Sequence, residues 1–312
     1  MKSLKRSTRD AFGKAILALG KKYSNVYVLT ADLRDSLRVS DFADALPNQF
    51  IECGVAEQNM VGISAGLALR GKVPFATSFG VFSPGRTWDQ LRVSVCLSNL
   101  NVNIIGGHGG LSNYKDGASH QALEDIAITR VLPNLKVVVP CDYNQTIKTV
   151  LSAYTDKSPW YIRLSATKTS DITLETQKFE IGKAQLLREG TSLTIASYGP
   201  LLENILNVAK KFGNKVEVLN FHTLKPLDEE SLLQSVLKTR RILVIEEHQI
   251  IGGLGSAVAS ALGQKFTKKF KLKILGVPDT FSHSARSLEA LYQKFGFDED
   301  SLYHSIKSFL EK

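Results

Sequence analysis

Short apolar segments alternate along the chain with longer segments in which apolar residues recur at helical spacing. The short segments are rich in β-branched residues and predict buried strands, whereas the longer ones predict amphipathic helices. In the first half, the predicted strands are NVYVLTA, PFATSF, NVNIIGG, LKVVVP and PWYIRLS. The predicted helices there are TRDAFGKAILALGKKY, EQNMVGISAGLALRG, TWDQLRVSVCLSNL and YNQTIKTVLSAYT, and QALEDIAITRVL is also helix-like. Strands that are apolar on both faces and separated by helices are typical of a mostly parallel sheet covered on both sides.

The alternation is interrupted at residues 166–184, where a polar, threonine-rich start predicts a linker. Beyond it the predicted strands are SLTIASYG, VEVLNF, RILVIEEH and LKILGVPD, and the predicted helices are LLENILNVAKKF, EESLLQSVLKT and GSAVASALGQKF. We therefore expect an α/β protein of two domains, residues 1–165 and 185–312. Each should be a mostly parallel sheet with helices on both faces.

The composition fits two globular domains, because 312 residues that are 43% hydrophobic can build sizeable cores. No apolar segment approaches the roughly 20 residues that span a bilayer, and the N-terminal MKSLKRSTRDAFGKA lacks the apolar core of a signal peptide. The cysteines, Cys53, Cys96 and Cys141, are far apart and odd in number, which argues against a disulfide framework or a zinc site. These features favour a cytoplasmic protein with no membrane partner.

The formal charge of +9 raises the question of nucleic-acid binding. The densest basic segment, KFTKKFKLK, lies between a predicted helix and a predicted strand, where a solvated turn accounts for it. No zinc-finger spacing and no RNA-recognition signature accompany it, so we expect no nucleic-acid partner. A positive surface would equally attract small phosphorylated substrates.

Polar residues follow the carboxyl ends of several predicted strands, where the active sites of parallel α/β sheets collect. The longest such segment, GGHGGLSNYKDGASHQ, is called here the glycine-rich loop (residues 106–121), and it carries His108, Asp116 and His120. Their spacing is not a recognised metal pattern, so we expect no metal ligands in this chain. A site for hydroxyl and phosphate groups is favoured, and a purely structural loop is the alternative.

A further segment, IECGVAEQNMVGISAGLALRGKVPFATSF, places Glu57 at the start of a helix of small residues. Taken alone, a glutamate there is a favourable charge in a first helical turn. Together with Arg9, TADLRDS, the glycine-rich loop, WYIRLS and EEH, however, the segment resembles the C-terminal half of transketolase, a thiamine diphosphate enzyme. The resemblance covers the pyrimidine-binding and C-terminal domains, and the chain looks like the separate C-terminal subunit of a split transketolase.

The resemblance implies a set of cofactor contacts. Glu57 matches the glutamate that bonds a pyrimidine nitrogen of thiamine diphosphate and favours the imino tautomer, which removes the thiazolium proton. Phe79 and Phe82 match aromatic residues around that pyrimidine. Trp88 matches a third aromatic position, although PGRTWDQ is spaced differently from the usual segment. Asp32 matches an aspartate near the cofactor.

The resemblance also implies contacts to the sugars. Arg9, Ser36, His108 and Arg163 match groups that hold a sugar phosphate, for which charge-assisted hydrogen bonds are strong and directional. Asp116 matches the residue at the second hydroxyl of the substrate. His120 matches a histidine that moves protons at the reacting carbonyl. Glu57, His108 and His120 are therefore the expected catalytic residues.

Some features depart from the family or fall outside its known sites. Asn113, Tyr114 and Lys115 stand where related loops have glycine and an acidic residue before DG, which leaves the donor and acceptor sugars open. The residues of the EEH segment, Glu246, Glu247 and His248, end a predicted strand and are expected to be structural or interfacial.

The sequence contains no GDG followed by the asparagine with which thiamine enzymes hold Mg²⁺ and the diphosphate. The resemblance therefore implies an N-terminal partner subunit that carries this motif, an active site at the interface, and a heterotetramer with self-association of the chain. The implied reaction moves a two-carbon ketol unit from a ketose phosphate to an aldose phosphate, as in pentose phosphate metabolism.

Other thiamine enzymes are alternatives. A 1-deoxyxylulose-5-phosphate synthase shares several motifs, but it usually has an aspartate at the position of His108 and is one longer chain. The beta subunit of a 2-oxoacid dehydrogenase has a different histidine pattern in its loop. A non-catalytic, partner-binding paralogue is a further alternative, against which stands the intact set of Glu57, His108, Asp116, His120 and Arg163.

Overall fold

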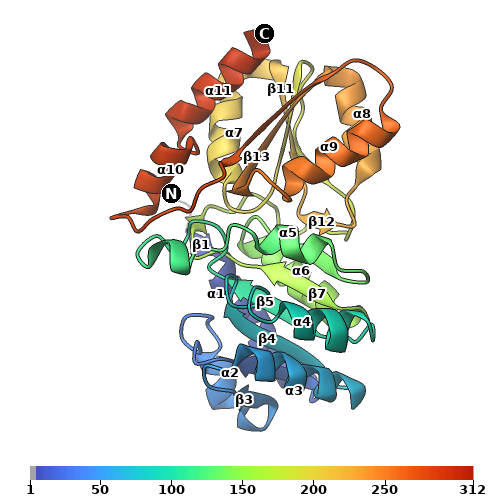
Figure 1. Ribbon diagram of the computed structural model, residues 1–312, viewed down its shortest axis with the longest axis vertical. Helices are drawn as coiled ribbons and strands as arrows, with labels where there is room; N and C mark the ends of the chain where they lie inside the picture. The colour runs from blue at the N-terminus through green and yellow to red at the C-terminus, as the bar shows by residue number, and fades with distance from the viewer. Residues whose placement is uncertain (1–4, 312) are drawn as a thin grey trace.

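The computed structural model describes residues 5–311, and the chain forms two α/β halves stacked end to end (Figure 1). Residues 1–4 and 312, at the outer bounds of the two predicted domains, lie outside the described part. The α/β class expected from the sequence is confirmed. The domain and linker bounds proposed near residues 165 and 185 stay a prediction.

The first half is built on a seven-stranded sheet in the order β12-β6-β7-β5-β4-β2-β3, which is parallel except where β12 meets β6. Each strand predicted in this half is present, and β3 and β12 are short strands that the sequence pattern did not predict. β12 comes from the second half of the chain, so both halves contribute to this sheet. The strands are β2 (Val26–Thr30), β3 (Phe50–Glu52), β4 (Val73–Phe79), β5 (Asn103–Gly107), β6 (Lys136–Val138), β7 (Trp160–Arg163) and β12 (Thr223–Lys225).

The second half is built on a five-stranded sheet in the order β14-β13-β10-β11-β9. It is parallel except for β9, an unpredicted edge strand that runs antiparallel to β11. A small additional sheet pairs β1 (Arg6–Ser7) with β8 (Lys168–Thr169). The strands of the five-stranded sheet are β9 (Gln185–Arg188), β10 (Leu193–Ser197), β11 (Val216–Asn220), β13 (Arg241–Gln249) and β14 (Lys271–Val277).

Helices cover both sheets and follow the predicted amphipathic segments closely. The helix predicted after Thr87 is a short α4 that continues as a π-helical segment, Leu91–Cys96. The unpredicted helices are α2, α10 and α11. The helices are α1 (Thr8–Lys22), α2 (Ser40–Ala45), α3 (Glu57–Leu69), α4 (Trp88–Gln90), α5 (Asp125–Arg130), α6 (Tyr143–Thr155), α7 (Leu202–Ala209), α8 (Glu229–Thr239), α9 (Leu254–Lys265), α10 (Leu288–Phe295) and α11 (Glu299–Glu311).

Local sequence sets where α1 begins and which face it buries. The Ser7 side chain accepts from the Asp10 N–H while the Asp10 carboxylate accepts from the Ser7 N–H, which is a capping box. Phe12 and Ile16, four residues apart, are both fully buried on the side that faces the sheet. Full burial of such a side chain contributes about 1.5–3 kcal/mol. The helix therefore holds Arg9, in its first turn, against the first sheet.

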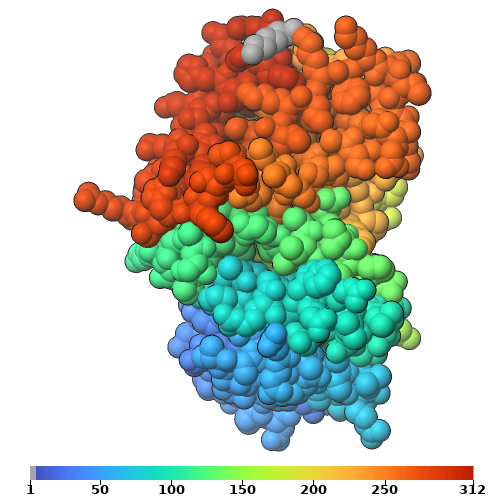
Figure 2. Space-filling view, viewed as in Figure 1, coloured from blue at the N-terminus to red at the C-terminus, as the bar shows by residue number. Residues whose placement is uncertain are grey.

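One continuous hydrophobic cluster joins the two halves. It contains Leu29 and Tyr161 from the first sheet together with Tyr198, Phe221 and Leu254 from the second half. In the space-filling view, the green residues that follow β5 form a continuous band between the blue and the orange parts (Figure 2). The glycine-rich loop and α5 therefore lie where the two halves meet.

Candidate functional site

A group of aromatic rings lies at the carboxyl ends of β4 and β5. Phe79 pairs in register with Gly107, so the residues that follow these strands meet at one edge. The Phe79 ring centroid is 4.4 Å from that of His108 and 6.1 Å from that of Phe82. His120, from the far end of the glycine-rich loop, lies 5.2 Å from Phe82. We call these rings the ring cluster, and its members come from the predicted cofactor and substrate sets.

Arg9 reaches the ring cluster from α1. Its Nη1 donates to the Ser36 carbonyl at 2.8 Å and lies 2.9 Å from His108 Nε2. Because a guanidinium only donates, His108 Nε2 accepts, which assigns the imidazole proton to Nδ1. Burial lowers the pKa of His108 to about 4, and the charge of Arg9 acts in the same direction. His108 is thus a neutral imidazole at ordinary pH, on a left-handed backbone with φ of 55°.

Glu57 begins α3 and is only 2% exposed. Its Oε2 accepts from Arg86 Nη1 at 2.7 Å, and the Arg86 guanidinium lies 4.8 Å from the centroid of the Phe82 ring. Arg86 therefore connects the buried carboxylate to the ring cluster. Arg86 was not among the residues predicted from the sequence. Its position in SPGR, four residues after the predicted cofactor contact Phe82, was the only local indication that it lies near the site. An open pocket of about 460 Å³ is lined by Val55, Ala56, Glu57, Gln58, Asn59 and Arg86.

The structure does not bring Trp88 or Asp32 into the ring cluster. The Trp88 indole N–H donates to the Ile128 carbonyl at 2.7 Å, and the ring packs against the hydrophobic cluster between the halves. Asp32 is exposed with φ of 57°, and its backbone N–H donates to the Glu52 carboxylate at 2.9 Å. The contacts of Trp88 describe packing, and the cofactor roles of both residues stay predictions.

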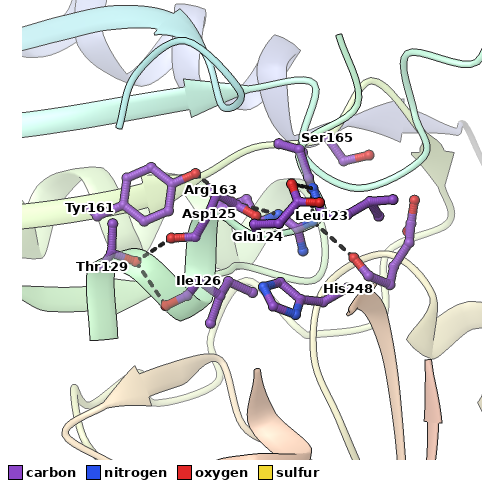
Figure 3. Close-up of polar contacts among 12 residues, drawn as sticks. Leu123, Glu124, Asp125, Ile126, Thr129, Tyr161, Arg163, Ser165 and His248 are labelled. Atoms are coloured by element: carbon purple, nitrogen blue, oxygen red, sulfur yellow. Dashed lines mark hydrogen bonds and ion pairs between the residues drawn. The ribbon is translucent and has the colours of Figure 1, made fainter. Parts of the chain in front are cut away.

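Arg163 lies beneath the glycine-rich loop rather than at its surface, and is 4% exposed. Its Nη2 donates to the Ala122 and Glu247 carbonyls at 2.8 and 2.9 Å, and its Nε pairs with the Asp125 carboxylate at 3.0 Å. Tyr161 donates to the same carboxylate (Figure 3). Burial alone would lower the pKa of Arg163, but Asp125 raises it above its usual value. These contacts describe a structural role, and the predicted phosphate contact stays a prediction.

Residues 113–116, in the middle of the glycine-rich loop, differ in their exposure and contacts. Asp116 is exposed, and its charge opposes the lowering of the His108 pKa. Tyr114 packs against the hydrophobic cluster of the second half, Asn113 is buried, and Lys115 is exposed. Of the three residues that depart from the family pattern, Tyr114 therefore contacts the second half, and Lys115 is exposed to solvent.

Residues 5–311 offer neither a metal centre nor a membrane span. Within that range, no group of three or more His, Cys, Asp or Glu side chains is arranged to hold a metal ion. No helix formed by those residues is long and apolar enough to cross a membrane. Cys96 and Cys141 are buried free thiols, and burial raises the pKa of each.

Comparison with known proteins gives two family matches. Residues 5–170 match the transketolase pyrimidine binding domain, and residues 182–302 match the transketolase C-terminal domain. A putative transketolase C-terminal section of Methanocaldococcus jannaschii is 39% identical, over 98% of this chain and 97% of its own length. A 6-deoxy-6-sulfo-D-fructose transketolase subunit of a Clostridium species is 35% identical, over 97% of this chain and 94% of its own.

A third relative and one solved structure extend the comparison. One of the subunits of an apulose-4-phosphate transketolase from Phocaeicola vulgatus is 34% identical, over 97% of each chain. A solved structure described as a split gene transketolase, inactive beta4 tetramer, superposes with a TM-score of 0.88 at 39% identity, over 98% of each chain. These relatives match the chain over nearly its whole length as well as theirs.

Proposed function

Because the chain belongs to the transketolase family, we propose that it is the C-terminal subunit of a split transketolase, which transfers a two-carbon ketol unit from a ketose phosphate to an aldose phosphate. The observation that carries this proposal is the buried Glu57 carboxylate, connected through Arg86 to a ring cluster that also contains His108 and His120. A ring-binding carboxylate and groups that can bind hydroxyls are thus joined by a continuous chain of contacts.

The side chains fit the pyrimidine end of thiamine diphosphate, which we propose as the cofactor. Arg86 occupies Oε2 of Glu57 and leaves Oε1 for a ring nitrogen, while Phe79 and Phe82 supply apolar surface for the ring. When bound, thiamine diphosphate supplies the carbanion chemistry of the reaction. The task of Glu57 is to hold a proton at the ring nitrogen.

The same edge of the sheet supports the proposed sugar contacts. Arg9 and His108 offer a fixed cation and a neutral imidazole whose Nδ1 proton is free to donate. Asp116 and His120, at the far end of the glycine-rich loop, are proposed to bind a hydroxyl and to move a proton at the carbonyl. For Arg163 we propose a structural role instead, because its donors face carbonyls and the Asp125 carboxylate.

The diphosphate and Mg²⁺ are assigned to an N-terminal partner subunit. The sequence lacks the GDG motif, and three relatives that it matches over 94–97% of their own length are called sections or subunits. Two copies of each chain would form a heterotetramer with the site at the interface. The sugars stay open, since those relatives are named for different substrates, and the cytoplasmic location expected from the scattered cysteines stays a prediction.

The test is to co-express the chain with candidate N-terminal subunits and to assay ketol transfer from xylulose 5-phosphate to ribose 5-phosphate with thiamine diphosphate and Mg²⁺. We expect transfer only by the complex, and weak cofactor binding by the chain alone in titration calorimetry. A complex that neither transfers a ketol unit nor binds the cofactor would overturn the proposal. Tight binding by the isolated chain would instead contradict the assignment of the diphosphate to a partner.

A further inference from the structure

The glycine-rich loop belongs to the first half of the chain, yet groups of the second half bond its backbone at Leu111 and Tyr114. Glu247, near the end of β13, is 6% exposed, and its Oε1 accepts from the Leu111 N–H at 2.6 Å. Its Oε2 accepts from the Tyr292 hydroxyl at 3.1 Å. Leu111 follows His108 by three residues, so this carboxylate grips the loop beside a predicted substrate contact.

Gly110 shows how closely the carboxylate approaches the loop. Its φ is 67°, a backbone conformation that side chains rarely adopt, and a Cβ placed there would lie 2.5 Å from Glu247 Oε1. The absence of a side chain at this position therefore lets the Glu247 carboxylate reach the Leu111 N–H. The glycine and the glutamate, far apart in sequence, form one contact.

Arg163 connects the backbone of Glu247 to the residues just after the glycine-rich loop. A single nitrogen, Nη2, donates both to the Glu247 carbonyl and to the Ala122 carbonyl, just past the end of the loop. The Gln249 N–H donates to the Leu123 carbonyl at 2.9 Å, which adds a further tie between β13 and the residues after the loop. Burial raises the pKa of Glu247, and the charge of Arg163 and the Leu111 N–H oppose that change.

A second segment of the C-terminal half holds the far part of the loop. The Ala285 N–H donates to the Tyr114 carbonyl at 2.8 Å, and the Gln121 side chain donates to the His283 carbonyl at 3.2 Å. Gly117, with φ of 76°, packs so closely that a Cβ there would lie 2.7 Å from the Ser284 nitrogen. The loop is thus held on both sides of Asp116.

We propose that Glu247 is a positioning residue for sugar recognition, through which the C-terminal domain fixes the conformation of the glycine-rich loop. It would act through the length of its side chain: the carboxylate accepts from the Leu111 N–H, and so sets where His108 and Asp116 lie relative to Phe79 and Phe82. The part of this inference that concerns sugars rests on the proposed function, whereas the hold on the loop does not.

Variants of Glu247 that separate reach from charge test the proposal. Glu247→Asp keeps the buried charge beside Arg163 but withdraws the carboxylate from Leu111, and Glu247→Gln keeps the reach and removes the charge. Glu246→Asp is the matched control, because Glu246 is buried on the same strand but accepts from the Leu254 and Gly255 N–H groups at the start of α9.

The first measurement is amide hydrogen exchange of the whole chain without a partner, combined with limited trypsin cleavage after the exposed Lys115. In Glu247→Asp we expect exchange near Leu111 to rise at least about tenfold and cleavage to accelerate, as when a hydrogen bond to a charged group is lost. Glu247→Gln should stay within about threefold of wild type, and Glu246→Asp should affect the start of α9 alone. Wild-type exchange in Glu247→Asp, or equal loosening in Glu247→Gln, would overturn the proposal.

The second measurement uses the complex with the N-terminal subunit, thiamine diphosphate and Mg²⁺. We expect Glu247→Asp to raise the KM for xylulose 5-phosphate at least about fivefold with a smaller change in kcat, and to leave the Kd of the cofactor unchanged. In Glu247→Gln, the KM for xylulose 5-phosphate should stay close to the wild-type value. An unchanged KM in Glu247→Asp would overturn the role in sugar recognition. A wild-type complex without transfer would sink the proposed function, while the exchange experiment would still decide the hold on the loop.

Discussion

The Glu57 pocket and the glycine-rich loop lie at the same edge of one sheet but are held in different ways. The pocket is built from neighbouring parts of the first half: Glu57 lies at the start of α3, and Arg86, which packs over Phe82, lies in the segment after β4. The loop is held from the second half, by Glu247 and by the segment around Ser284. Mutations near Glu57 should therefore affect the chemical step, whereas mutations in the second half that loosen the glycine-rich loop should affect sugar binding.

The largest effect on activity is expected from mutation of Glu57. Glu57→Gln should lower kcat of the complex by about a thousandfold, because the amide cannot exchange the proton that the cofactor ring requires. Assembly with the N-terminal subunit and exchange in the glycine-rich loop should stay as in wild type. Steady-state assays and native mass spectrometry would check both, and an unchanged turnover would refute the role given to Glu57.

Arg163→Met should remove the hydrogen bonds and the ion pair that Arg163 makes beneath the glycine-rich loop. Removal of one partner of a buried ion pair leaves Asp125 charged and unpaired, which typically lowers the free energy of unfolding by about 3–5 kcal/mol. Urea denaturation would measure it, with Arg188→Met, an arginine outside this network, as the control. If Arg163 instead served only to bind phosphate, stability would be unchanged and the KM alone would rise.

Arg86→Leu should have a smaller and local effect. Glu57 would lose its hydrogen-bonded cation, but the arginine is about half exposed, so we expect a loss of about 1–2 kcal/mol in stability. Hydrogen exchange in the glycine-rich loop should not change, in contrast to Glu247→Asp. Loosening of the loop in Arg86→Leu would show that the two regions are coupled more strongly than their contacts suggest.

The smallest effect concerns pH. Burial lowers the pKa of the fully buried His222 to about 4, below the usual value of 6.5, so the unfolded chain takes up a proton first as the medium is acidified. The stability associated with the neutral form is present above pH 6.5 and is lost between about pH 6.5 and 4. His222→Gln should flatten the slope of unfolding free energy in this window, and the exposed His304→Gln should not. Equal slopes in wild type and His222→Gln would contradict this account.

Much of the fold was predictable because burial leaves a local pattern. Segments such as PFATSF and LKVVVP are apolar on both faces, and they became β4 and β6 of a parallel sheet. β9 and β12 left no such pattern, since they are short and their pairing is set by strands distant in sequence.

The site was predictable to the extent that strand ends converge. Phe79 ends β4 and Phe82 follows it, whereas His108 and His120 follow the adjacent β5, and the four rings meet. Trp88 turned to the Ile128 carbonyl instead, a contact 40 residues away that no local spacing indicates. Arg86 and the grip of Glu247 on the loop were likewise not predicted, because each depends on a pairing that exists only once the chain has folded.

The antiparallel β12 makes the first sheet depend on a strand from the second half of the chain. Thr223–Lys225 closes one edge of the first sheet beside β6, although it follows the predicted linker and three strands of the second half, β9, β10 and β11. A fragment cut at the predicted linker would leave the backbone groups of β6 open to pairing with another molecule, and exposed strand edges of this kind promote aggregation. The natural unit of expression is therefore the whole chain.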